Sequence, residues 1–171
     1  MAVVKEINLD KFVKEFGAPS YDKGRLLKKQ KKFIYESVYE GCLKSVEPMA
    51  ERSPVDTGLY ASAWSVRKIN KNEIHFGNTA PYAEVIEKGA KPHTAPLQPL
   101  IEWSARQLQV PADDPEAKRM GWAVMKKIEK EGMEPKYVLE HGLEEVIIPM
   151  IKQEIQRRKN KYEDTTKRGR D

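Results

Sequence analysis

The hydrophobic pattern of the first third of the chain predicts one long helix. Its apolar positions recur in steps of seven, four, four, four and three residues: Leu27, Ile34, Val38, Cys42, Val46 and Met49. This spacing places them on one helical face, opposite a face of lysines and glutamates. Ser20 or Asp22 can cap the start of the helix. Pro54 disfavours helical geometry in the residue before it, so the helix is expected to end near Arg52.

Alternating apolar positions later in the chain predict a β-hairpin. The first strand covers residues 62–69 and alternates around Trp64. A polar turn follows, and the return strand covers residues 73–76 and alternates around Ile74. Since successive side chains of a strand point to opposite faces, this pattern indicates a small sheet with one buried face.

Prolines and glycines divide the remaining sequence into helices. A short helix is expected with Pro81 in its first turn and Gly89 just past its end. Two further helices follow, one opening at Pro99 and one starting at an acidic cap before Pro115. A last helix should be kinked or split at Pro149, because proline lacks the backbone N–H that a helix interior uses.

These elements predict an α+β fold in a single domain over residues 20–155. It combines a long N-terminal helix, a small antiparallel sheet with its hairpin near residues 62–76, and several C-terminal helices. Residues 1–19 carry a short amphipathic pattern, interpreted as a short helix or an N-terminal arm that docks on another surface. Residues 156–171 are polar and charged, and are interpreted as a flexible tail. Both ends are candidates for segments that become ordered on assembly.

Composition limits the size of the core and the compartment. Of the 171 residues, 39% are hydrophobic and 33% are charged, so the core is thin and long helices or partner-covered surfaces are expected. No apolar run approaches the roughly 20 residues that cross a bilayer, so no membrane contact is predicted. Charged residues interrupt positions 1–16, which excludes a signal peptide there and predicts a cytosolic protein. Cys42 is the one cysteine and is expected to be buried on a helix.

Positive charge is concentrated in two places. The segment 156–171 has seven basic and three acidic residues, which is +4 of the formal net charge of +5. The segment 23–32 has six cations in ten residues. Either cluster is a candidate contact for DNA phosphates or a protein interface, and both also fit a solvated helix face and a disordered tail. The residues proposed for such contacts are Lys28, Lys31, Lys32, Arg157 and Arg158.

Patterns that carry catalysis are lacking in the sequence. His75, His93 and His141 form none of the spacings of a sequence-local metal site. Ser62 and Ser65 are not framed by the nucleophile-elbow motif of serine hydrolases. A phosphate-binding glycine loop is also missing. We therefore expect no catalytic residue, cofactor or metal, and a metal-assisted hydrolase stays only as an alternative that elemental analysis would test.

Four short blocks resemble a known family. In chain order they are Ser53-Pro-Val-Asp-Thr-Gly-Leu-Tyr-Ala-Ser-Ala-Trp64, Phe76-Gly-Asn-Thr-Ala-Pro-Tyr82, Tyr82-Ala-Glu-Val-Ile-Glu87-Lys-Gly89 and Pro135-Lys-Tyr-Val-Leu-Glu-His-Gly-Leu143. Together they resemble the head–tail joining and tail-completion family of long-tailed bacteriophages, which includes minor tail protein Z. The resemblance covers about residues 22–155. It departs from the family at Tyr137, where a phenylalanine is usual, and residues 1–19 and 160–171 have no counterpart.

The resemblance implies structural residues rather than catalytic ones. They are Pro54, Asp56, Thr57, Gly58, Trp64, Gly77, Pro81, Tyr82, Glu87 and Gly89. Physical chemistry agrees: proline restricts φ, Gly58 allows a positive φ, and Asp56 can accept hydrogen bonds from nearby backbone amides. Tyr82 and Glu87 can anchor a loop by packing and hydrogen bonding.

The function implied by the resemblance is that of a virion neck subunit. Such a subunit joins the tail to the head connector by protein–protein contacts, in a ring that is expected to be hexameric. Its partners would be copies of itself, connector or portal-side proteins, and the tail terminator or tail tube, with non-specific contact to channel DNA. It would be made in the host cytoplasm and end in the virion. The alternative is a DNA-binding accessory protein that uses the basic helix face and the C-terminal tail.

Overall fold

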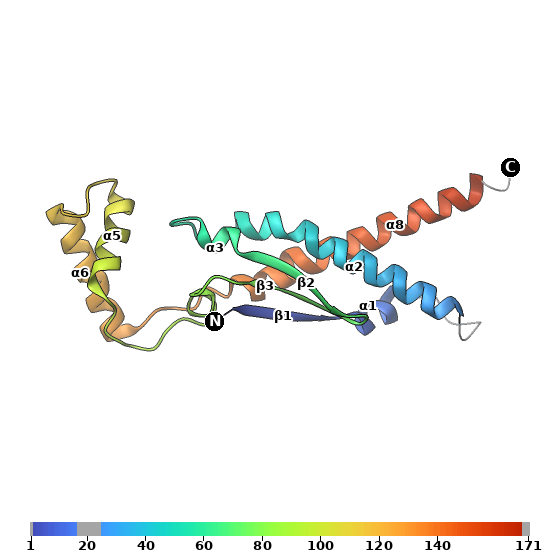
Figure 1. Cartoon of the computed structure of the whole chain (residues 1–171), viewed down its shortest axis with the longest axis horizontal. Helices are drawn as coiled ribbons and strands as arrows, with labels where there is room; N and C mark the ends of the chain where they lie inside the picture. The colour runs from blue at the N-terminus through green and yellow to red at the C-terminus, as the bar shows by residue number, and fades with distance from the viewer. Residues whose placement is uncertain (1, 17–24, 169–171) are drawn as a thin grey trace.

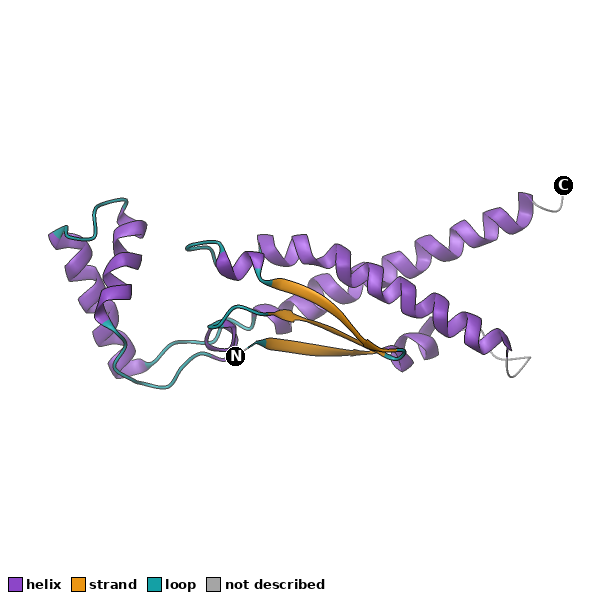
Figure 2. Ribbon diagram, in the orientation of Figure 1, coloured by secondary structure: helices purple, strands orange, loops and turns teal. Residues whose placement is uncertain are grey.

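The computed structural model describes the backbone of residues 2–16 and 25–168, and the side chains of residues 2–16 and 31–161. It confirms the α+β fold: a small sheet packs on long helices, and a helical hairpin projects from one end (Figures 1 and 2). In chain order the elements are β1 (Val3–Asn8), α1 (Leu9–Phe16), α2 (Arg25–Glu51), α3 (Leu59–Ser62), β2 (Trp64–Asn70), β3 (Glu73–Asn78), α4 (Ala83–Lys88), α5 (Leu97–Leu108), α6 (Pro115–Glu131), α7 (Val138–Gly142), the π-helical turn η1 (Leu143–Ile147) and α8 (Ile148–Arg168).

The sheet contains the predicted hairpin and one strand more. Its order is β1-β3-β2, and both pairs are antiparallel. Strand β2 begins at Trp64, two residues later than predicted, because residues 59–62 form the short helix α3. Strand β1 was missed: its six residues include one buried side chain, Ile7, so they show no clear alternation.

The N-terminal segment belongs to the core of the domain. It was predicted as a separate arm, yet β1 pairs with β3 and α1 packs beside α2. Ile7, Leu9 and Phe12 are buried in the main hydrophobic cluster. The amphipathic pattern was thus read correctly as a docking face, but the surface that it covers is the chain's own.

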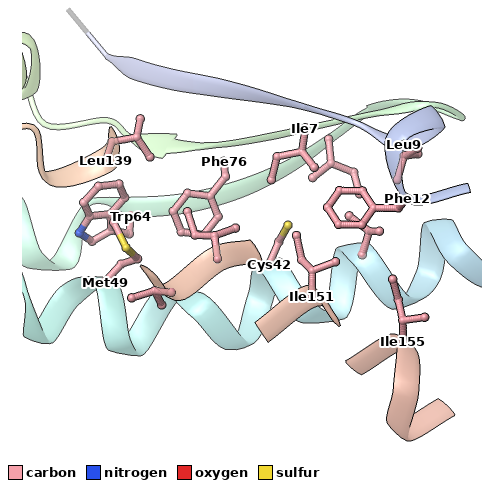
Figure 3. Close-up of a cluster of buried hydrophobic side chains, with 14 of the residues drawn as sticks. Ile7, Leu9, Phe12, Cys42, Met49, Trp64, Phe76, Leu139, Ile151 and Ile155 are labelled. Atoms are coloured by element: carbon pink, nitrogen blue, oxygen red, sulfur yellow. The ribbon is translucent and has the colours of Figure 1, made fainter. Parts of the chain in front are cut away.

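The core lies between the sheet and the crossing helices α2 and α8. Figure 3 shows Cys42 of α2, Phe76 of β3 and Ile151 of α8 gathered in this layer. The predicted stripe of α2 is confirmed for Ile34, Val38, Cys42 and Met49, which are buried, and for Val46, which is half-buried. The expected caps Ser20 and Asp22 and the side chain of Leu27 lie outside the described residues. Each such side chain contributes roughly 1.5–3 kcal/mol of hydrophobic stabilisation when it is removed from water.

The last helical segment is interrupted before Pro149, as predicted. The interruption is the π-helical turn η1, which separates α7 from α8. A π turn inserts one extra residue into the helix, and here it ends at Ile147, two residues before Pro149, which cannot donate a backbone hydrogen bond. Helix α8 then continues to Arg168, so most of the predicted flexible tail is helical. Buried Ile155 and Glu154 hold this part of α8 against α2.

Helices α5 and α6 form a hairpin that projects from the end of the sheet (Figure 1). Asp114 caps α6 as predicted, accepting a hydrogen bond of 2.7 Å from the backbone N–H of Glu116. Gly121 of α6 lies directly against Ile101 of α5, so the two helices pack closely. Two chain segments connect the hairpin to the body, and they pair at one antiparallel bridge between Ala90 and Met133.

Helices α2 and α8 cross at Gly41 with no room for a larger side chain. A Cβ atom at Gly41 would lie 2.6 Å from the backbone Cα of Ile151, closer than real Cβ contacts. Gly41→Val should therefore lower the free energy of unfolding by about 1–3 kcal/mol, the usual cost of overpacking. Urea denaturation measures this. Glu47→Val places the same side chain on the exposed face of α2 and should change stability by less than about 0.5 kcal/mol.

Candidate functional site

The turn that opens the first motif block is held by buried hydrogen bonds. Ser53 Oγ donates to the backbone carbonyl of Met49 at 2.8 Å and accepts from the indole Nε1 of Trp64, also at 2.8 Å. Gly58 has φ of 81° and precedes α3, so the positive φ expected from the sequence is confirmed. Pro54 is half-buried beside Ser53, whereas Thr57 is exposed. The block thus shapes the passage from α2 into the sheet.

The second block is bound to the first through Asn78. Its buried side chain donates from Nδ2 to the backbone carbonyl of Tyr60 at 2.7 Å and accepts from the N–H of Ala80 at 3.0 Å. Just before it, Gly77 faces β1 so closely that a Cβ atom would lie 2.2 Å from the carbonyl oxygen of Val3. Asn78 was not singled out from the sequence, because its partner Tyr60 lies in a different motif block.

Aromatic rings cover this junction. Tyr60 makes an edge contact with Trp64 at 5.7 Å and stacks on Tyr82 at 6.4 Å, measured between ring centroids. Tyr82 is itself partly exposed, as is Pro81 beside it. Burial, with Glu87 nearby, raises the pKa of the Tyr60 hydroxyl well above its usual range. Tyr60 therefore stays neutral and acts as a packing residue.

Glu87 connects the third motif block to the fourth. It is a buried residue of α4, and its carboxylate accepts hydrogen bonds from the backbone N–H groups of Leu139 at 2.9 Å and Glu140 at 3.0 Å. These N–H groups lie in the first turn of α7, so they have no acceptor within the helix. The helix dipole also favours a negative charge at this position. Gly89, with φ of 72°, lets the chain leave α4 against the carbonyl of Met133. The loop-anchoring role expected of Glu87 is thus seen as a helix cap.

Asp56 joins the first motif block to the projecting hairpin. Its carboxylate accepts two hydrogen bonds from the Arg106 guanidinium, at 2.9 and 2.7 Å. The sequence predicted hydrogen bonds to nearby backbone amides instead. Hydrogen bonding by Arg106 holds the pKa of Asp56 below its ordinary value. No sequence signal pointed to Arg106, because it lies 50 positions away on another helix.

The chemistry of this end of the molecule is that of a structural joint. The polar groups of Ser53, Asp56, Asn78 and Glu87 each hold two segments together.

Among the described side chains, no group of three or more histidine, cysteine, aspartate or glutamate residues is placed to hold a metal ion. Within the same described residues, no helix is long and apolar enough to cross a membrane.

The basic candidates fall into two groups with different surroundings. Lys31 and Lys32 are exposed on α2, whereas the side chain of Lys28 lies outside the described residues. Arg157 and Arg158 are engaged within the chain: both guanidinium groups bond to the carboxylate of Glu154. The sequence offered these two arginines as interface or DNA contacts, and the structure gives them an intramolecular role.

Glu154 is the centre of a charged cluster between α8 and α2. Its side chain is only 2% exposed and is bound by Lys44 Nζ at 2.7 Å, Arg157 Nη2 at 2.7 Å and Arg158 Nε at 3.0 Å. These hydrogen bonds, that of Arg157 first, lower the pKa of Glu154 to about 2. Hydrogen bonds from three cationic side chains offset the cost of removing this carboxylate from water, so loss of one partner would leave a buried charge uncompensated.

Glu87→Ala tests the cap that joins two motif blocks. Loss of the carboxylate leaves the N–H groups of Leu139 and Glu140 without their acceptor, so we expect a loss of about 1–2 kcal/mol of stability. Amide hydrogen exchange should accelerate first at these two positions. Glu84→Ala removes a carboxylate from the same helix, where it pairs with the exposed Lys88, and should leave that exchange unchanged. Equal exchange in both variants would contradict the capping role.

Glu154 should make stability depend on acid pH. Its folded pKa of about 2 lies below the ordinary value of 4.5, so its contribution is complete above pH 4.5 and is lost as pH falls toward 2. Glu154→Gln is expected to lose about 2 kcal/mol at pH 7, with the difference from the parent protein shrinking below pH 4.5. Chemical denaturation at several pH values measures this. Glu144→Gln, at an exposed position, should give a curve parallel to the parent protein.

Comparison with known protein families, curated proteins and solved structures found no match to this chain. The resemblance to phage tail-completion proteins consequently rests on the four motif blocks, which lie close together at the hairpin end of the domain.

Proposed function

We propose that this chain is a structural subunit of a tailed-phage virion, a tail-completion or neck protein that joins the tail to the head connector. The observation that carries the proposal is the projecting α5–α6 hairpin with the exposed apolar residues around its base. Because the hairpin projects away from the body, apolar side chains on and near it are left exposed in a single copy of the chain (Figure 1). The motif blocks support the same reading, because every one of them serves to build this end of the molecule.

Exposed apolar side chains are concentrated at the hairpin end. Of the ten large hydrophobic residues that are exposed in the described part of the chain, seven lie on α3, α4, α6 and the segments next to them: Val55, Leu59, Tyr82, Val85, Trp122, Met133 and Tyr137. Val55 is 70% and Trp122 is 54% exposed. Tyrosine, tryptophan and methionine are also the residues that protein interfaces favour at their centres. This distribution supports a protein-binding surface here.

The hairpin is suited to bridge two subunits. Its inner face is filled by contacts between α5 and α6, and it meets the body through two connecting segments and the Asp56–Arg106 ion pair. Docking of the hairpin on a neighbouring copy would pair two different surfaces, and repetition of such a contact closes a ring when the rotation allows it. A ring, expected to be hexameric, would then present one face to the connector and the other to the tail terminator or tube.

A gene-deletion experiment with complementation tests the proposal. Lysates of a phage that lacks this gene should contain filled heads and finished tails that are separate in electron micrographs, and the parent gene should restore joined particles. Trp122→Ala should fail to restore them, because it removes the largest exposed apolar side chain of α6. Leu43→Ala, at an exposed position of α2, should restore them fully.

Other outcomes have defined meanings. Abnormally long tails in the deletion mutant would move the role to termination of tail length. Intact, infectious particles without this gene would overturn the proposal. Purified Trp122→Ala protein should fold with the parent's circular dichroism spectrum, because Trp122 is 54% exposed and lies outside the main hydrophobic cluster.

A further inference from the structure

A groove lies between the N-terminal half of α2 and the turn that connects β2 to β3. Its volume is about 760 Å³. Helix α2 contributes Lys31, Lys32, Tyr35 and Glu36 to its walls, and the β2–β3 turn region contributes Lys68, Ile69, Asn70, Lys71 and Asn72. The groove is at the end of the sheet next to α1, away from the α5–α6 hairpin (Figure 1). We call it the lysine groove.

The lysine groove carries an excess of positive charge. Four lysines face one carboxylate, Glu36, so its lining has a net charge of +3. Glu36 is already shared, at 3.9 Å from Lys32 Nζ and 3.7 Å from Arg158 Nη1. In the described part of the chain, neither Lys31 nor Lys71 is paired with an acidic residue. The ammonium groups of Lys31 and Lys71 are therefore available to bind an anionic partner.

Aromatic residues hold one of these cations in place. Lys68 Nζ lies 3.9 Å from the ring centroid of Tyr39 and 5.6 Å from that of Tyr35. Such cation–π contacts fix the direction of a long side chain that would otherwise be free. Tyr35 and the exposed Ile69 form an apolar section of the groove wall. Lys68 is thus held by ring contacts that a lysine on a solvated helix face lacks.

We propose that the lysine groove binds the phosphate backbone of DNA. Lysine ammonium groups bind phosphates as point charges, without the fixed geometry that a bidentate arginine contact needs. Several lysines along one groove therefore suit a backbone whose phosphates repeat along its length. The volume exceeds the needs of a single phosphate, and the apolar part suits the deoxyribose that lies between phosphates. The groove lies at the end of the domain opposite the α5–α6 hairpin, so its binding of DNA can be tested separately from the proposed neck function.

Binding through this groove is independent of base sequence. Asn70, a residue type that can read bases, is already used: its Nδ2 donates to Glu73 and its Oδ1 accepts from the N–H of Asn72. Contacts to phosphates position a protein on DNA and carry no sequence information. Four lysines that neutralise four phosphates predict a slope of about −3.6 for log K against log salt, at about −0.9 for each phosphate.

The experiment measures binding of the full chain to a labelled, mixed-sequence duplex of about 20 base pairs, by fluorescence anisotropy between 50 and 200 mM NaCl; these are conditions in which phosphate contacts dominate. The double variant Lys31→Gln/Lys71→Gln should bind roughly tenfold more weakly or worse, with the slope reduced by about 2. Its matched control is Lys127→Gln/Lys130→Gln on α6, which removes the same charge from exposed positions of the hairpin. The control should bind like the parent protein. All three proteins should give the same circular dichroism spectrum.

Three results would overturn the proposal. Equal weakening by the groove variant and the control would show that only net charge matters. Undiminished binding by the groove variant would place the DNA contact elsewhere, for example on the C-terminal half of α8. Absence of DNA binding, together with binding of polyglutamate that the groove variant loses, would assign the groove to an acidic protein partner.

Discussion

The close crossing of α2 and α8 is the constraint on which the rest of the structure depends. Gly41 allows the backbone of α8 to approach at Ile151, and the apolar side chains of both helices then cover one face of the sheet. Farther along the same interface, the buried carboxylate of Glu154 forms ion pairs with Lys44 of α2 and Arg157 of α8. Because α8 is anchored in this way, it continues beyond Ile155 to Arg168, and Arg157 and Arg158 bond to Glu154 within the fold.

Hydrogen bonds join the motif blocks at the other end of α2. Asn78 connects the first two blocks, and Glu87 connects the last two by capping α7. Ser53 joins the end of α2 to Trp64 within the first block. Asp56 extends the same joint to the hairpin through Arg106. These blocks are distant in the sequence, but hydrogen bonds and an ion pair join them in one region of the structure. Such an arrangement is typical of residues with a structural role. The molecule thereby has two ends of different character, an apolar hairpin end and a basic end with the lysine groove.

Local rules were enough for much of the fold. The stripe of α2, the β2–β3 hairpin and the cap at Asp114 follow from side-chain periodicity and from hydrogen bonding within a few residues. Strand β1 was missed because it is an edge strand with one buried side chain, Ile7, and its partner is 67 positions later at Ile74. Such a pairing depends on surface that exists only once the rest of the sheet has formed.

By itself, the sequence determined the class of the fold, the long helix, the interruption before Pro149 and the residues of the turn around Gly58. These features depend on backbone geometry and on neighbours close in the chain. Only the tertiary structure decided which charges are engaged and which are available. Arg157 and Arg158 are held by Glu154, while Lys31 is brought into one groove with Lys71. The physical reason is that a charge acts through the groups that surround it in space, and these come from distant parts of the chain.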